Sequence, residues 1–201
     1  MTRAARGRAV PVAGALAAAV ALGACGSSSH SKGSVTSTTS SSGPAEKSFS
    51  APGMAIHFRF PARFHEVQLA QSKRIAGNTG RASHAAIGTG PFDLLIVTRF
   101  PKRPIPVTTQ NISRLKPQFD AAVSSAIGRR LSSTIGTLAG HPALSYPPAP
   151  VVGLPTRATS RITNVFVADD QYELNCQYTP RAAATITAAC DEMLRTLSAG
   201  R

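Results

Sequence analysis

The sequence of 201 residues contains no tryptophan, and aromatic residues make up only 5% of it. This scarcity argues against an aromatic-rich binding face. Acidic residues are also few, because nine Asp and Glu accompany 22 Lys and Arg and leave a formal net charge of +13. These scattered acids offer no carboxylate pair for a glycosidase. A hydrophobic content of 42% nevertheless supports a packed core and excludes a wholly disordered chain.

Motifs for catalysis and for cofactor binding are also missing. We find no Gly-x-Ser-x-Gly elbow and no glycine loop that leads into a helix to hold phosphate. None of the five histidines is paired at a helical spacing that would favour a metal site. We therefore expect no catalytic residue, no metal and no cofactor, with a hydrolase of unrecognised type as the less favoured alternative.

The longest apolar segment lies near the N-terminus. Residues 10–22 are rich in Ala, Val and Leu, but Pro11 and Gly14 interrupt them. The run is too short to span about 30 Å of hydrocarbon as a lasting transmembrane helix. It follows three arginines within the first eight residues and ends in Leu22-Gly23-Ala24-Cys25.

This arrangement resembles the signal peptide and lipobox of bacterial lipoproteins. The resemblance implies a signal peptide over residues 1–24 and lipidation of Cys25, including palmitate-type acyl chains. The mature chain would then begin at Cys25 and be held outside the cytoplasm by lipid in the cell membrane. The alternative is an ordinary secretory signal with an incidental cysteine.

The residues that follow Cys25 are predicted to be a tether. Residues 26–48 are rich in Ser and Thr and contain almost no apolar side chain, so burial cannot offset their conformational entropy. Residues 25–48 are therefore interpreted as the lipidated cysteine and its flexible spacer. A single folded domain is predicted over residues 49–201, where the hydrophobic pattern begins.

Alternating and continuous apolar patterns predict several strands in this domain. The pattern over 54–60 indicates a half-buried strand, and the run over 92–100 indicates a central strand covered on both faces. Residues 68–80 are polar and predict a loop or weak strand. The remaining predicted strands cover 134–146, either whole or broken around Gly140, and 157–167 and 171–178, which are joined by a turn at 168–170.

Two helices are predicted from spacings of three and four. The first begins near Thr108 or Thr109, contains Pro117 and is closed by Gly128. Pro117 indicates either a kink or a restart of that helix. The apolar face consists of Ile112, Leu115, Phe119, Val123 and Ala126. The second helix begins at Pro180 and ends at Gly200, with Ile186, Cys190, Met193, Leu194 and Leu197 on one face.

The three cysteines fit the same interpretation. If Cys25 is lipidated, Cys176 and Cys190 are left as a pair. Each lies on the apolar face of its element, so the two meet if the last helix packs on the last strand. A disulfide is the expected outcome in an oxidising compartment, and two separate buried thiols are the alternative.

Residues 56–61, 172–177 and 189–197 resemble the corresponding parts of actinobacterial cell-envelope lipoproteins that carry a PsbP-like domain. The resemblance implies an α+β domain in which helices flank an antiparallel sheet on both sides, an α/β/α sandwich. PsbP-like domains mostly act as binding or assembly accessories, so the resemblance implies no reaction.

Basic charge is the remaining indication of a partner. Two basic doublets and a neighbouring arginine are candidate contacts for an anionic partner: Arg99, Lys102, Arg103, Arg129 and Arg130. An anionic lipid, a wall polymer or an envelope protein would suit them, whereas the extracytoplasmic address makes nucleic acid a poor partner. A dispersed, solubilising basic surface is an equal alternative. The sequence thus favours a non-enzymatic envelope accessory, with a carrier that holds a lipid or another apolar ligand in an internal cavity as the second hypothesis.

Overall fold

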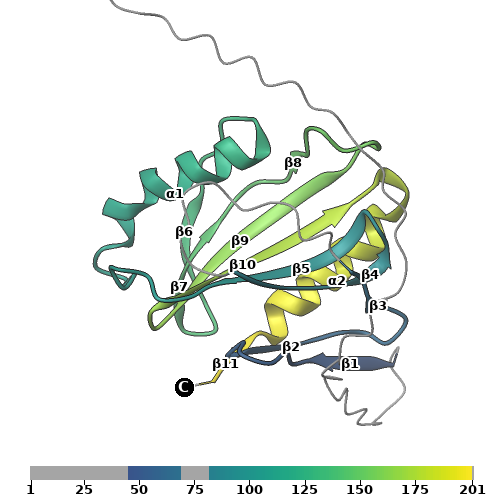
Figure 1. Cartoon of the computed structure of the whole chain (residues 1–201), viewed down its shortest axis with the longest axis horizontal. Coiled ribbons are helices and arrows are strands. Elements are labelled where there is room, and N and C mark those ends of the chain that lie inside the picture. Colours follow the sequence, from purple (N-terminus) through teal and green to yellow (C-terminus); the bar gives the residue numbers. More distant parts are fainter. Residues whose placement is uncertain (1–44, 69–81, 201) are drawn as a thin grey trace, which may run out of the picture. The chain divides into compact units, whose positions relative to one another are not determined.

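The computed structural model describes residues 45–68 and 82–200 (Figure 1). The predicted signal peptide, Cys25 and most of the predicted tether lie outside these residues, as does nearly all of the predicted 68–80 loop. The two longest strands, β9 (Thr159–Val167) and β10 (Asp170–Tyr178), pair antiparallel along their whole length. The tight turn between them holds Ala168 at a φ of 50° and confirms the predicted hairpin.

β9 and β10 form the middle of an eight-stranded antiparallel sheet, the main sheet. Its order is β3-β4-β5-β10-β9-β7-β6, and β8 pairs separately with β9. The remaining bounds are β3 His65–Glu66, β4 Ser83–Gly90, β5 Asp93–Phe100, β6 Thr134–Leu138, β7 His141–Ser145 and β8 Ala149–Pro150. The internal strand predicted at 92–100 is confirmed as β5, and the 134–146 segment is a pair of strands that turns at Ala139 and Gly140.

One face of the main sheet is covered by α1 (Ile112–Ile127). Its buried residues include Ile112, Phe119 and Val123, as predicted. The prediction that Ala126 belongs to this buried face was wrong: Ala126 is exposed, and the neighbouring Ile127 is buried instead. The helix continues through Pro117, so it does not restart there. Gly128 ends it with a φ of 73°, a conformation that glycine adopts without steric cost.

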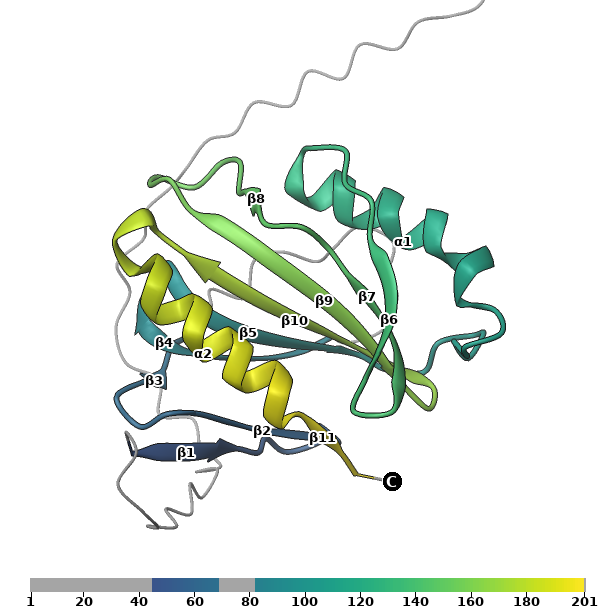
Figure 2. The ribbon, with the colours of Figure 1, turned by 180° about the vertical axis from the view of Figure 1, so that it is seen from behind.

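The other face is covered by α2 (Ala183–Thr196), which follows the short 3₁₀ helix η1 (Pro180–Ala182). On its far side α2 packs against a second, three-stranded sheet of order β1-β2-β11, as Figures 1 and 2 show. β1 is Glu46–Phe49, β2 is Ile56–Pro61 and β11 is Ser198–Ala199. One hydrophobic core therefore joins residues of both sheets across α2.

Two predicted boundaries were wrong at this small sheet. The last helix ends at Thr196 rather than Gly200, because Ser198 and Ala199 leave it to pair with β2. The folded domain begins earlier than residue 49, because β1 starts at Glu46 and pairs with β2 from Glu46↔Pro61 onward. Residues 46–48 of the predicted tether therefore belong to a strand.

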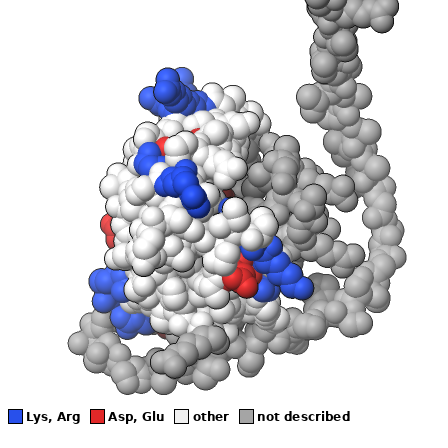
Figure 3. Space-filling view, turned by 90° about the vertical axis from the view of Figure 1, so that its left-hand side faces the viewer, with Lys and Arg blue, Asp and Glu red and all other residues white. Residues whose placement is uncertain are grey.

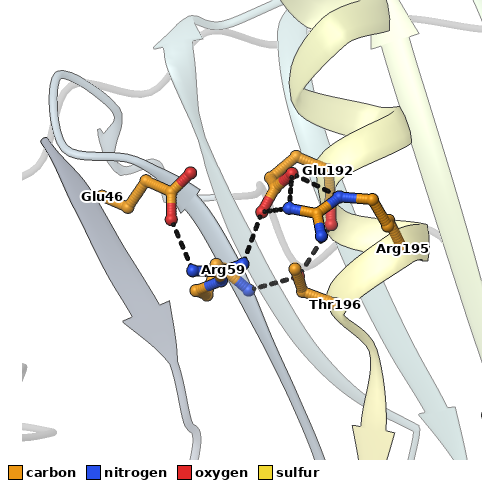
Figure 4. A network of polar contacts seen from close by, with 5 residues as sticks. All are labelled: Glu46, Arg59, Glu192, Arg195 and Thr196. Atoms are coloured by element: carbon orange, nitrogen blue, oxygen red, sulfur yellow. Dashed lines mark hydrogen bonds and ion pairs between the residues drawn. The ribbon is translucent and has the colours of Figure 1, made fainter. Parts of the chain in front are cut away.

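A network of polar contacts holds the small sheet to α2 (Figure 4). Arg59 of β2 reaches Glu46 of β1 at 3.1 Å and Glu192 of α2 at 3.4 Å. The backbone N–H of Arg59 donates to Thr196 Oγ1 at 2.9 Å, and Arg195 donates to Glu192. Arg59 and Arg195 are therefore paired with acidic residues of the same chain.

The predicted disulfide is present between β10 and α2. Cys176 and Cys190 are each 1% exposed, and their Cα atoms are 6.0 Å apart. The predicted fold class is confirmed: helices cover both faces of an antiparallel sheet, and all described residues belong to one compact unit. Neither α1 nor α2, the two α-helices of the described residues, has the length and apolar character of a membrane span.

Candidate functional site

The main sheet carries an open groove at the end where the β9–β10 and β6–β7 turns lie. Its volume is about 360 Å³. The lining comes from residues 106–109 before α1, residues 140–142 after the β6–β7 turn, and Phe166, Ala168 and Asp169 of the β9–β10 hairpin. Three segments that are distant in the sequence therefore meet here.

Hydrogen bonds fix the wall of this groove that precedes α1. Thr108 N–H donates to Asn111 Oδ1 at 2.8 Å, and Asn111 N–H donates to Thr108 Oγ1 at 3.3 Å. The Asn111 amide also donates to the carbonyl of Pro106 at 2.9 Å. The predicted cap residue Thr108 thus closes the turn before α1, while Asn111 occupies the cap position of the helix itself.

The groove brings together groups that can bind polar ligands but no assembled nucleophile. His141 and Asp169 line it with Thr108 and Thr109. Within residues 45–68 and 82–200 no hydrogen bond links His141 to a hydroxyl or carboxylate. The groove is open to solvent, so it also does not provide the enclosed cavity that carriage of an apolar ligand requires.

Arg103, one of the predicted anion contacts, lies beneath α1. Its guanidinium carbon is 4.6 Å from the ring centroid of Phe119 and 5.9 Å from that of Phe166. Nη1 donates to Gln171 Oε1 at 2.5 Å, and the backbone N–H donates to the carbonyl of Asp169 at 2.7 Å. Burial lowers the pKa of Arg103. This arginine therefore ties the chain before α1 to the hairpin and is not freely displayed.

The polar contacts of Arg103 continue along the sheet under α1. The Gln171 amide donates to Asn164 Oδ1 at 3.1 Å, and Asn164 is 0% exposed. Three buried atoms, Arg103 Nε, Asn164 Nδ2 and Tyr146 OH, have no hydrogen-bond partner among residues 45–68 and 82–200. Burial also raises the pKa of Tyr146, which keeps its hydroxyl protonated. All three atoms can donate a hydrogen bond, and buried donors of this kind are normally satisfied by ordered water.

Arg99 and Lys102 are held by Asp170. Arg99 pairs in register with Tyr172, whose side chain points toward α2, so it lies on the opposite face of the main sheet from Arg103. Its Nε donates to Asp170 Oδ2 at 2.7 Å, and this hydrogen bond raises the pKa of Arg99. The backbone N–H of Lys102 donates to Asp170 Oδ1 at 3.2 Å, and the Lys102 side chain is exposed.

The second basic doublet lies at the other end of α1. Arg129 and Arg130 directly follow Gly128 and are exposed. A 16-residue helix is about 24 Å long, so α1 separates them from Lys102 and Arg103. The structure therefore does not gather the five predicted residues into one patch. Figure 3 likewise shows separate groups of basic residues on the face in view.

Sequence reasoning did not single out Glu173, which lies on the α1-side face of the main sheet. It is opposite Thr98 of β5 and Asn164 of β9, and Thr98 contacts His84 at 3.1 Å. Desolvation raises the pKa of Glu173 to about 7. Its place on the polar side of an alternating strand was visible in the sequence, but its partial burial within the sheet was not. The described residues contain no cluster of three metal-ligating side chains.

No protein-family model matches the sequence, and no curated protein matches it. The fold is similar to that of cyanobacterial PsbP (CyanoP) from Synechocystis sp. PCC 6803, with a TM-score of 0.54 and 9% identity over 82% of this chain and 98% of that chain. It is also similar to LpqN, involved in cell envelope biogenesis of Mycobacterium tuberculosis, with a TM-score of 0.49 and 13% identity over 78% and 92%.

A third similar structure is a crystal structure from Bacteroides thetaiotaomicron, with a TM-score of 0.48 and 9% identity. The match covers 77% of this chain and about half, 48%, of that one. At these identities similarity establishes the fold alone. The CyanoP match, whose TM-score is above 0.5, supports a PsbP-like fold.

Proposed function

We propose that this chain is a lipid-anchored, extracytoplasmic, non-enzymatic binding accessory of the cell envelope, similar to the actinobacterial lipoproteins that its sequence resembles. The observation that carries the proposal is the bond between Cys176 and Cys190. It leaves Cys25 as the one remaining cysteine of the sequence, at the end of an apolar run in a lipobox-like context. Disulfides persist in oxidising compartments, which agrees with export.

The start of the fold suits such an anchor. β1 begins at Glu46, so 20 residues separate it from Cys25. A flexible chain of that length has a root-mean-square span of about 25 Å. This span would keep the domain close to the membrane surface while leaving it free to rotate.

A basic domain at that distance would meet anionic components of the envelope. Lys102, Arg129 and Arg130 are the exposed members of the predicted set. Each basic residue close to an anionic lipid surface contributes about 1 kcal/mol. We propose binding rather than catalysis because the groove offers rigid walls and polar contacts without a nucleophile activated by a base.

Fatty-acid labelling tests the anchor. The full chain is expressed in a bacterium that processes lipoproteins, and cells are fed an alkyne-tagged palmitate. We expect label on the membrane-bound chain and none on Cys25→Ser. Cys190→Ala is the matched control, because it removes a buried cysteine and should keep the label. An unlabelled wild-type chain, or a labelled Cys25→Ser chain, would contradict the proposal.

A further inference from the structure

β6 forms an open edge of the main sheet. Within the described part of the chain it pairs only with β7, from Thr134↔Ser145 to Leu138↔His141. Its first four residues are exposed and Leu138 is partly buried. The outward N–H and C=O groups of such a strand are available to another strand.

The other strands at the ends of the two sheets, β3, β11 and β1, each have a protection that β6 lacks. β3 and β11 contain two residues each, and β1 carries Glu46 and Lys47. β6 reads Thr-Ile-Gly-Thr-Leu, with no charged residue and no proline, and Ile135 is 40% exposed. Short length, charge and proline are the usual means of preventing edge pairing. β6 has none of these protections.

The surroundings of β6 differ at its two ends. Arg129 and Arg130 lie a few residues before its first residue, are exposed, and form no ion pair with the described acids. At the other end the Ala139–Gly140 turn leads directly into the groove, which Gly140 and His141 line. An added strand would therefore have cations at one end and a groove at the other.

We propose that β6 takes up an extended, acidic segment of a partner polypeptide as an additional strand. The backbone of the segment would pair with β6, and its carboxylates would meet Arg129 and Arg130. A second copy of this chain fits less well, because the basic residues far outnumber the acidic ones, 22 Lys and Arg against nine Asp and Glu, and only three of these arginines lie in the predicted signal peptide, so two copies repel. The inference concerns the folded domain and does not depend on lipid at Cys25.

A synthetic peptide tests the proposal. The probe is fluorescein-labelled Thr-Val-Thr-Val-Thr-Glu-Glu-Glu with blocked ends, and its binding to the full chain in detergent is followed by fluorescence anisotropy. In an antiparallel pairing its glutamates lie beside Arg129 and Arg130. We expect binding that weakens as salt is raised toward about 0.15 M. Peptides with lysine in place of glutamate, or with proline in place of valine, should not bind.

Two protein variants separate charge from strand pairing. Arg129→Gln/Arg130→Gln should weaken binding about 2- to 30-fold, as expected for two exposed ion pairs. Arg157→Gln/Arg181→Gln removes the same charge from two exposed residues elsewhere and should leave binding unchanged. Hydrogen exchange should show slower exchange of the amides of residues 134–138 when the probe is bound.

Proline substitutions in β6 give a second measurement. The backbone N–H groups of successive residues in β6 point alternately toward β7 and toward the open edge. Of the two variants Gly136→Pro and Thr137→Pro, one therefore removes an N–H group that points to the open edge and leaves the hydrogen bonds with β7 intact. That variant should fold and lose binding. Absence of binding by the probe, equal binding of the proline peptide, or unchanged exchange at 134–138 would overturn the proposal. A dimer that protects these amides without peptide would overturn it as well, because the edge would then be occupied by a second copy.

Discussion

The disulfide between β10 and α2 allows a quantitative prediction about stability. Cys176 and Cys190 are 14 residues apart in the sequence. In the chain-entropy model, closing a loop of this length lowers the entropy of the unfolded chain enough to stabilise the fold by about 3 kcal/mol at 25 °C. Both cysteines are buried, so the change to Cys176→Ala/Cys190→Ala also removes two sulfur atoms from the core. We therefore expect a loss of about 3–5 kcal/mol.

Urea denaturation followed by far-ultraviolet circular dichroism measures this loss, because the chain has no tryptophan to report unfolding by fluorescence. For a domain of this size, 3 kcal/mol corresponds to a decrease in Tm of about 6–12 °C. Cys25→Ser is the control and should unfold like the wild-type chain, since it leaves the bond intact. If the double variant unfolds within about 0.5 kcal/mol of wild type, the bond does not constrain the unfolded chain as argued.

Three further predictions concern single residues. The pKa of Glu173 is about 7 in the fold and about 4.3 in an unfolded chain, so the folded state binds the proton more tightly. The free energy of unfolding should therefore decrease as pH rises between these two values, and urea denaturation of Glu173→Gln should not show that decrease. Arg103→Lys should destabilise the domain by about 1–3 kcal/mol, because an ammonium cannot replace the stacked, hydrogen-bonded guanidinium. The control Lys102→Gln should change the free energy of unfolding by less than about 0.5 kcal/mol. Gly88→Ala should lower the Tm markedly, because a Cβ there would collide with the carbonyl oxygen of Asp93; an unchanged melting curve would contradict this geometry.

Elements with a strong apolar period were predictable from the sequence, and those without one were not. β5 and the β9–β10 hairpin matched their patterns closely. β4 was missed because its sequence mixes polar residues, alanine and glycine, and it is held in place by pairing with β5. β11 was assigned to the last helix because Ser198 and Ala199 join a sheet only through their contact with β2.

The candidate site depended even more on tertiary structure. Its lining residues come from three segments that no local pattern connects, such as those that contain Thr108, His141 and Asp169. Arg103 had the same sequence signature as Lys102, yet only Arg103 is stacked beneath α1, against Phe119. Net charge and local doublets therefore predicted a basic protein but not which cations are free to meet a partner.

Intact mass spectrometry of the chain purified from membranes would test the central claim most directly. The account predicts a chain that begins at Cys25, carries the mass of a diacylglycerol or further acyl groups, and lacks the two hydrogens that the Cys176–Cys190 bond removes. A chain with an unmodified cysteine at position 25 would contradict the proposed anchor. Free thiols at positions 176 and 190 would contradict the exported, oxidised state on which that proposal depends.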